Sequence, residues 1–189
     1  MGKSTTAEMF RDEGVPTWSA DEAVHRLYAA GGIGAAAVSE ICPQAVGSDG
    51  VKRDILSEWV KEDPNNLGRL EALIHPLVAA DRRAFIEGAT CDLILVDIPL
   101  LFETNAQSQV DFVIVVSVTE EEQKRRVLAR PGMTPELFEL ISQKQTPDKE
   151  KRALADFVIK TESLDAARAS VQSILNKIRA DETDARNRS

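Results

Sequence analysis

Short runs of branched apolar residues alternate along this chain with segments of helical pattern, and this alternation limits the folds open to it. The runs 92–97 and 110–118 lack a period-two pattern, which is typical of strands buried on both faces. Shorter strands are predicted at 15–19 and 157–159. Because helical segments separate these strands, the sequence predicts an α/β fold with a parallel sheet and helices on both faces.

The helical segments are of unequal length. Short helices are predicted at 4–12, 35–42, 120–129 and 135–145, and an amphipathic closing helix at 163–180. The stretch from about 27 to 88 is mostly helical and too long for a simple crossover, so we expect an inserted helical subdomain. The polar tail 181–189 is predicted to be disordered.

Composition excludes several classes of protein. The net charge of −8 argues against general binding to nucleic acid or to anionic membranes, since both need a basic surface. Cys42 and Cys91 lie in unlike contexts, and we expect both to be reduced and buried in a cytoplasmic protein. No run has the length of a membrane span, and the first residues do not form a signal peptide.

The residues Gly2, Lys3, Ser4 and Thr5 match the end of the phosphate-binding P-loop motif, G-x-x-x-x-G-K-[ST]. In this motif, backbone N–H groups and the start of the following helix hold phosphate oxygens. Lys3 is the candidate to reach the terminal phosphates, and the Ser4 hydroxyl is the candidate ligand of Mg²⁺. The alternative is an accidental match. Because the first half of the motif and its strand do not appear in the sequence, we predict that Met1 is an internal methionine of a longer P-loop.

Two acidic residues follow predicted strands, at the edge where parallel sheets bind their ligands. Asp21 could accept the proton of an attacking hydroxyl group or hold Mg²⁺ through water. Its competing interpretation is a helix N-cap. Asp97 could be an acidic residue of the Walker-B type or simply the first residue of a loop.

A basic cluster marks the predicted helix 120–129 and the residue after it: Lys124, Arg125, Arg126 and Arg130. Arg126 and Arg130 are four residues apart and so share one face of a helix. Such a run is usually solvated surface. In a phosphate-handling protein, however, a forked guanidinium on a mobile segment neutralises the charge of the transferred group.

Five segments together resemble, in order and at the right intervals, the motifs of the dephospho-coenzyme A kinase family. They are 2–5 (the end of the P-loop), Ala20-Asp21, 70–76 (L-E-x-I-x-H-P), 99–103 (P-L-L-F-E) and the set Gln145, Lys151, Arg152, Ala155, Asp156 and Ile159. The resemblance spans residues 2 to about 180. A single segment would be weak, whereas five in order are highly specific.

The resemblance implies a P-loop NTPase-type kinase core, a helical substrate-binding insertion and a lid. The implied single kinase domain divides into a core (about 1–26, 89–119 and 152–180), the insertion (about 27–88) and the lid (about 120–151). The implied reaction is ATP-dependent phosphorylation of the ribose 3′-hydroxyl of dephospho-coenzyme A, the last step of coenzyme A synthesis. Its implied cofactors are ATP and Mg²⁺, with neither nucleic acid nor a membrane as partner.

Roles for individual residues also follow from the resemblance. Asp21 is implied as the general base at the substrate, and His75 as a neighbour of the coenzyme A moiety. Arg126 and Arg130 would close over the transferring phosphoryl group and exclude water. His75 has a competing interpretation as a packing or helix-end residue. The sequence departs from the family pattern at Ser19, His25, Pro131 and Thr161.

Two alternatives stay open at this point. Another small P-loop kinase, acting on a nucleoside monophosphate or on shikimate, would share Lys3, Ser4 and a lid. It would not need His75-Pro76 or the 99–103 segment in these positions. A truncated relative would instead bind a nucleotide or a partner without turnover.

Overall fold

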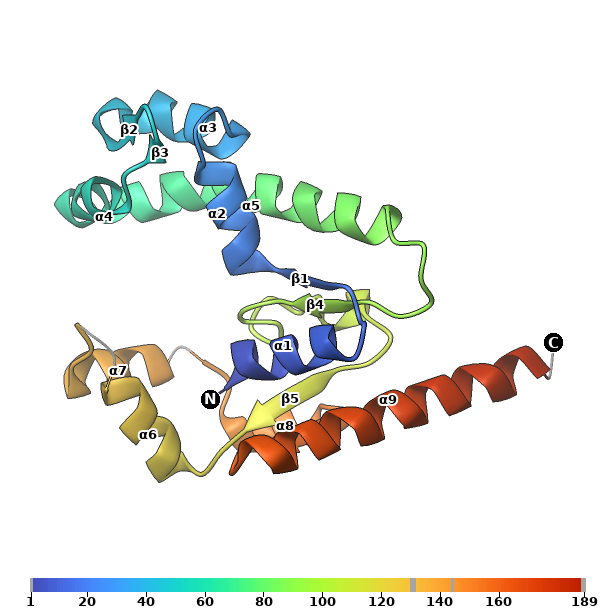
Figure 1. Ribbon diagram of the computed structural model, residues 1–189. Coiled ribbons are helices and arrows are strands. Elements are labelled where there is room, and N and C mark those ends of the chain that lie inside the picture. The colour runs from blue at the N-terminus through green and yellow to red at the C-terminus, as the bar shows by residue number, and fades with distance from the viewer. Residues whose placement is uncertain (1, 130–131, 144, 188–189) are drawn as a thin grey trace. The chain divides into compact units, whose positions relative to one another are not determined.

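The computed structural model describes residues 2–129, 132–143 and 145–187, with side chains described up to residue 180. The chain divides into two compact units, one formed by Met1–Val15 with Pro99–Ser189 and the other by Pro16–Ile98. Each unit contains one pair of parallel strands (Figure 1). Parallel strands connected through helices define the α/β class, so this part of the predicted fold is confirmed.

The first unit is built on strands β5 (Ile114–Ser117) and β6 (Phe157–Lys160), which pair in parallel with Ile114 opposite Phe157. Two helices far apart in sequence, α1 (Lys3–Asp12) and α9 (Leu164–Asn187), contact each other, and α9 also contacts β6 (Figure 1). These elements bury Met9, Phe10, Ile159, Val171 and Leu175. The unit also holds η2 (Ala106–Gln109), α6 (Glu120–Leu128), α7 (Pro135–Gln143) and α8 (Asp148–Ala153).

The second unit is mostly helical. Its strands β1 (Thr17–Ser19) and β4 (Leu95–Asp97) pair in parallel, with Ser19 opposite Asp97 at their carboxyl ends. Its helices are α2 (Ala20–Tyr28), α3 (Ile33–Ile41), η1 (Pro43–Ala45), α4 (Arg53–Glu62) and α5 (Pro64–Glu87). A short antiparallel pair, β2 (Val46–Gly47) and β3 (Gly50–Val51), separates η1 from α4.

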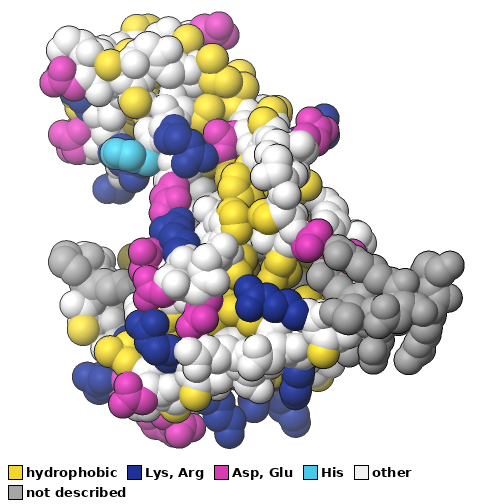
Figure 2. All heavy atoms as spheres, turned by 45° about the vertical axis from the view of Figure 1, so that its right-hand side comes forward, with side chains coloured by type: hydrophobic (Ala, Val, Ile, Leu, Met, Phe, Trp, Pro, Cys, Tyr) yellow, Lys and Arg dark blue, Asp and Glu magenta, His cyan; other side chains and the backbone are white. Residues whose placement is uncertain are grey.

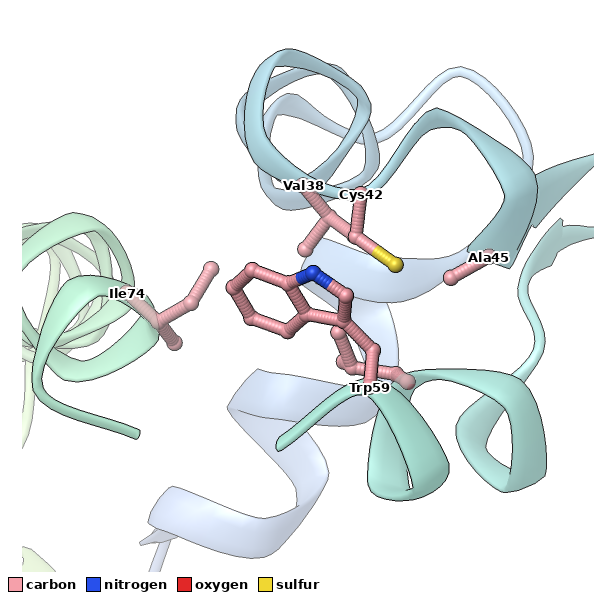
Figure 3. Packing of buried hydrophobic residues seen from close by; sticks show 6 residues of the cluster. Val38, Cys42, Ala45, Trp59 and Ile74 are labelled. Atoms are coloured by element: carbon pink, nitrogen blue, oxygen red, sulfur yellow. The ribbon is translucent and has the colours of Figure 1, made fainter. Parts of the chain in front are cut away.

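One apolar cluster holds the helices of the second unit together. The Trp59 ring of α4 lies between Ile74 of α5 and the side chains of Val38 and Cys42 (Figure 3). Leu56 and Ala45 complete the cluster. Because α3, α4 and α5 each contribute side chains to the same core, the helical stretch predicted as a subdomain has a core of its own.

A buried asparagine fixes the junction between α4 and α5. Asn66 is buried, its amide donates to the Trp59 carbonyl at 2.8 Å, and its oxygen accepts from Arg69 at 3.1 Å. Asp63 precedes α5 as its N-cap and accepts from the backbone N–H of Asn65 at 2.8 Å, with Pro64 at the first helical position. Asp63 and Pro64 therefore separate α4 from α5 and start the new helix.

The close approach of β3 to the end of α2 requires glycine at position 50. Gly50 has φ +104, which lies in the region that favours glycine. A Cβ atom there would stand 2.2 Å from the Tyr28 carbonyl oxygen. Residues 48 and 49 form the turn between β2 and β3, two strands that the sequence analysis did not predict.

The strands differ from the prediction in length and burial. Within the described residues they form three two-stranded sheets. The runs 92–97 and 110–118 shorten to β4 and β5, and the prediction that both are fully buried is wrong. Every residue of β4 is half-buried, and half-buried and buried residues alternate in β5. Helices and loops packed on a sheet cover the faces of its strands, so half-buried residues mean that this cover is incomplete.

Two further expectations need correction. Helix α9 continues to Asn187, so 181–187 are helical rather than disordered, because this stretch contains neither glycine nor proline to end the helix. Residues 188 and 189 lie outside the described residues. Cys42 is buried as predicted, but Cys91 is exposed in the segment between α5 and β4. The functional division into core, insertion and lid stays a prediction.

None of the described helices is both long enough and apolar enough to cross a membrane.

Replacing Ile74 with alanine should lower the free energy of unfolding by about 2–5 kcal/mol, because the change leaves a cavity beside Trp59. Urea titration followed by circular dichroism measures this. Leu67→Ala is the matched control on the same helix, since Leu67 is exposed, and it should change stability by less than about 0.5 kcal/mol. Equal losses in the two variants would contradict the assignment of this core.

Candidate active site

The P-loop residues form the start of α1. Gly2 precedes the helix with φ +88, a left-handed conformation that favours glycine, and a Cβ atom at this position would stand 3.4 Å from the Thr161 side chain. Lys3, Ser4 and Thr5 form the first turn with exposed side chains. The first N–H groups of a helix have no partners within it and carry its positive end. This arrangement suits phosphate oxygens.

A pocket of about 320 Å³ adjoins this helix start. It is lined from α1 by Gly2, Thr5, Thr6 and Met9, from α6 by Arg126, and after β6 by Thr161, Glu162, Ser163, Leu164 and Ala167. The structure therefore brings together Gly2, Thr5 and Arg126, which the sequence placed in separate motifs. Thr161, one of the departures from the family pattern, belongs to the same pocket.

Thr6 is a site residue that sequence reasoning missed. Its side chain is buried, and its hydroxyl oxygen has no hydrogen-bond partner among the described residues. It also lines the 320 Å³ pocket. A buried hydroxyl without a partner is costly, so a ligand group in this pocket would satisfy it. The available signal was a threonine on the apolar side of α1, next to Ala7 and two residues after Ser4.

Arg126 is held at the pocket by two acceptors. Its Nε donates to Glu122 on the same helix, and one terminal nitrogen donates to the Thr161 carbonyl at 3.2 Å. Arg125 binds the same carboxylate with two hydrogen bonds of 2.7 Å. The hydrogen bonds from Arg125, and next in size those from Arg126, lower the pKa of Glu122 to about 2. Glu122 thus stays charged at physiological pH. Arg130, the other arginine assigned to the predicted lid, lies outside the described residues.

An ion pair with little exposed surface joins two of the family motifs. Glu103 of the 99–103 segment accepts from Lys151 at 2.8 Å and from the Thr146 backbone N–H at 2.7 Å. The Glu103 and Lys151 side chains are only 14% and 18% exposed. Burial alone would raise the pKa of Glu103, but the hydrogen bonds from Lys151 and Thr146 and the Lys151 charge outweigh it and lower the pKa.

Two aspartates tie the same region to the strands. Asp156 accepts from the Val113 backbone N–H at 2.7 Å, just before β5 begins. Asp148, in the first turn of α8, accepts from the Ser117 hydroxyl at 2.8 Å and pairs with Arg152 at 2.9 Å. Asp148, Arg152 and Asp156 thus order the connection from α7 to β6.

A second pocket, of about 580 Å³, lies in the same unit among β5, α6, α7 and α8. Its lining includes Gln123, Gln145, Asp148 and Arg152 but none of the P-loop residues. The smaller pocket is the better candidate for a nucleotide because Gly2, Thr5 and Thr6 line it.

Asp21 belongs to the second unit and is not a helix cap. Ser19 is the N-cap of α2, so Asp21 is the second helical residue, with an exposed side chain. The N-cap interpretation of Asp21 is therefore wrong. Because Ser19 pairs with Asp97, Asp21 and Asp97 follow the carboxyl ends of β1 and β4 at the same sheet edge. Ligands of parallel sheets bind at such edges.

His75 is exposed in the middle of α5, directly before a proline inside the helix. This position contradicts its interpretation as a packing or helix-end residue. His25 is likewise exposed, and it follows Asp21 by four residues on α2, which places both on one side of that helix.

Comparison with known proteins agrees with this geometry. A family model described as dephospho-CoA kinase matches residues 1–166. A protein named dephospho-CoA kinase from Ruegeria pomeroyi is 53% identical over 180 residues, which cover 95% of this chain and 91% of the relative. A protein of the same name from Mesorhizobium japonicum is 50% identical, with 95% and 92% covered.

The chain belongs to the dephospho-CoA kinase family.

Solved structures give the same result for the fold. A dephospho-CoA kinase from Campylobacter jejuni is 25% identical with a TM-score of 0.68. The match covers 94% of the present chain and 91% of the Campylobacter chain. A crystal structure from Thermus thermophilus has a TM-score of 0.75 at 28% identity, covering 93% and 91%. The predicted P-loop NTPase-type α/β fold is therefore confirmed.

Glu103→Gln should destabilise the protein by about 3 kcal/mol at neutral pH, because it leaves Lys151 without its partner in a nearly buried position. The pKa of Glu103 is lowered on folding, so its contribution is fully present above its ordinary value of 4.5 and is lost as the pH falls through the lowered value. Urea titrations from about pH 7 to about pH 3 should show that the difference in the free energy of unfolding between the variant and wild type becomes smaller as the pH falls.

The control for this experiment is Asp12→Asn, which breaks the exposed ion pair between Asp12 and Arg168 at 3.2 Å. It should change stability by less than about 1 kcal/mol. A loss in Glu103→Gln no larger than this control would contradict the structural role of the Glu103–Lys151 pair.

Proposed function

We propose that this chain transfers the γ-phosphoryl group of ATP to the ribose 3′-hydroxyl of dephospho-coenzyme A. The observation that carries this proposal is the pocket shared by Gly2, Thr5 and Arg126, in a chain 53% identical to a protein named dephospho-CoA kinase. The product is coenzyme A, and the reaction is the last step of its synthesis. We also propose that the chain acts in the cytoplasm.

ATP binds at the start of α1. The backbone N–H groups after Gly2 donate hydrogen bonds to its phosphate oxygens, and Lys3 binds the terminal phosphates. The 320 Å³ pocket takes the adenosine part, since Met9, Leu164 and Ala167 offer apolar contacts and Thr6 offers a hydroxyl group.

The chain fits Mg²⁺ brought in by the nucleotide. Mg²⁺ keeps several waters and needs only one or two protein ligands beside the phosphates. The exposed Ser4 hydroxyl in the first turn of α1 supplies one such ligand. In the described ranges no group of three or more His, Cys, Asp or Glu side chains forms a metal site. When bound, the ion neutralises charge on the transferred group.

Asp21 acts as the general base. The ribose 3′-oxygen forms a bond to the γ-phosphorus, the bond to the β–γ bridging oxygen breaks, and ADP leaves. The hydroxyl proton goes to the Asp21 carboxylate, which is exposed at the carboxyl edge of the β1–β4 pair. His75, exposed on α5, contacts the coenzyme A moiety.

Arg126 and Arg130 bind the nucleotide phosphates as the lid closes. Arg126 already lies at the pocket, and Glu122 and the Thr161 carbonyl restrict its guanidinium group. Holding a charged donor in place before the reaction lowers the reorganisation that the reaction requires. Charges of both signs are interspersed on the face shown in Figure 2, so local groups such as these, rather than a broad basic surface, attract the phosphates.

Turnover assays test the choice of acceptor. The purified chain should release ADP from MgATP in the presence of dephospho-coenzyme A, and not with AMP or shikimate. Activity with only one of the latter two would overturn the proposed substrate. No turnover with any acceptor, together with a thermal shift on adding MgATP, would instead support a nucleotide-binding relative without activity.

Asp21→Asn should lower kcat by roughly 10²–10⁴-fold with little change in the KM for ATP, because the variant cannot accept a proton. Steady-state kinetics measure both constants. Asp54→Asn is the matched control, since Asp54 has the equivalent place in the first turn of α4 and is also exposed. If both variants retained wild-type kcat, Asp21 would not be the base.

A further inference from the structure

Asp81 links three elements of the second unit through one carboxylate oxygen. Its Oδ1 accepts from the Trp18 indole nitrogen at 2.7 Å and from the Arg26 guanidinium at 2.6 Å. Trp18 belongs to β1, Arg26 to α2 and Asp81 to α5. Trp18 and Asp81 are 63 residues apart in the sequence.

The two donors flank Asp21 along the chain. Trp18 precedes Asp21 by three residues, and Arg26 follows it by five. Strand β1 ends at Ser19 and helix α2 begins at Ala20, so no loop separates the strand from the helix. The backbone that carries Asp21 is therefore held on both sides by the same carboxylate.

The Ser19 side chain does not cap α2. Ser19 is the N-cap, but its side chain makes no capping hydrogen bond. A serine at this position usually accepts from a backbone N–H of the first turn and orients the helix. The hydrogen bonds to Asp81 connect both β1 and α2 to α5.

The two bonds differ in strength. Trp18 is 3% exposed, and its indole N–H can only donate, so removal of the acceptor leaves a buried donor unpaired. The Arg26 and Asp81 side chains are 52% and 25% exposed, which is the range in which an ion pair contributes little by itself. The buried hydrogen bond from Trp18 thus holds the Asp81 carboxylate in place, and the ion pair with Arg26 connects α2 to that carboxylate.

We propose that Asp81 is a positioning residue, which orients the start of α2 so that Asp21 meets the acceptor hydroxyl. This role rests on the proposed function of Asp21 as general base. A general base must lie within hydrogen-bond reach of the proton that it accepts, and displacement by about 1 Å can cost 100-fold in rate. Asp81 itself touches neither substrate in this assignment.

The test is a double-mutant cycle between Asp81 and Asp21. Asp81→Ala removes both bonds and should lower kcat by at least about tenfold, with the KM for ATP unchanged. Asp81→Asn keeps an oxygen for the indole and should have an intermediate effect. In the Asp21→Asn background, Asp81→Ala should cause little further loss, because no base remains to be positioned.

Two measurements separate positioning from general stability. Trp18 and Trp59 are the two tryptophans of the chain, so a change in indole emission in Asp81→Ala reports loss of the Trp18 bond. Asp12→Asn is the matched control, since it also deprives an arginine of its partner, and it should leave kcat unchanged. If Asp81→Ala fails to fold, Asp81→Asn serves in the same cycle.

The outcomes separate the two assignments. If Asp21→Asn lowers kcat and Asp81→Ala does not, or if their effects multiply, the positioning role is overturned while the base assignment stands. If Asp21→Asn leaves kcat unchanged, the base assignment fails and the positioning role fails with it. If Asp81→Ala lowers kcat when Asp21 is present and not in the Asp21→Asn background, the proposal is supported.

Discussion

Parallel pairing of strands is the constraint on which the candidate site depends. In a parallel pair both carboxyl ends lie at one edge, so segments that leave the strands there are neighbours even when they are far apart in sequence. In the first unit this places the Thr161–Leu164 segment after β6 beside the helix α6 that follows β5. In the second unit it places Asp21 and Asp97 at one edge. Each unit thus presents chemistry-bearing residues at the carboxyl edge of its own strand pair.

Polar contacts between distant segments then hold these residues in place. Glu103 joins the 99–103 segment to Lys151 and Thr146, and Asp148 joins α8 to Ser117. Most of these contacts are partly or largely shielded from water, where an unpaired group is costly. The motif residues therefore fall into two groups, since Lys3 and Asp21 carry proposed chemistry whereas Glu103 and Lys151 connect the structure around it.

The family assignment and the geometry support each other without overlapping. Family membership rests on the matched family model and on identity over most of the chain. The geometry adds which residues share a pocket, and it adds Thr6 and Asp81, for which the family motifs supplied no role. It also changes the interpretation of Asp21 and His75, because one is not a cap and the other is neither buried nor at a helix end.

The sequence by itself determined the α/β class, the approximate position of most helices and strands, and the match of residues 2–5 to the P-loop motif. These depend on propensity, periodicity and capping, which act between residues close together in the chain. It did not determine the exposure of Cys91, the extension of α9 to Asn187, or the division of the strands into separate pairs. Only the tertiary structure decided that Arg126 donates to the Thr161 carbonyl and that Asp81 accepts a hydrogen bond from Trp18. The partners in these two bonds are 35 and 63 residues apart, so their contact depends on the path of the whole chain.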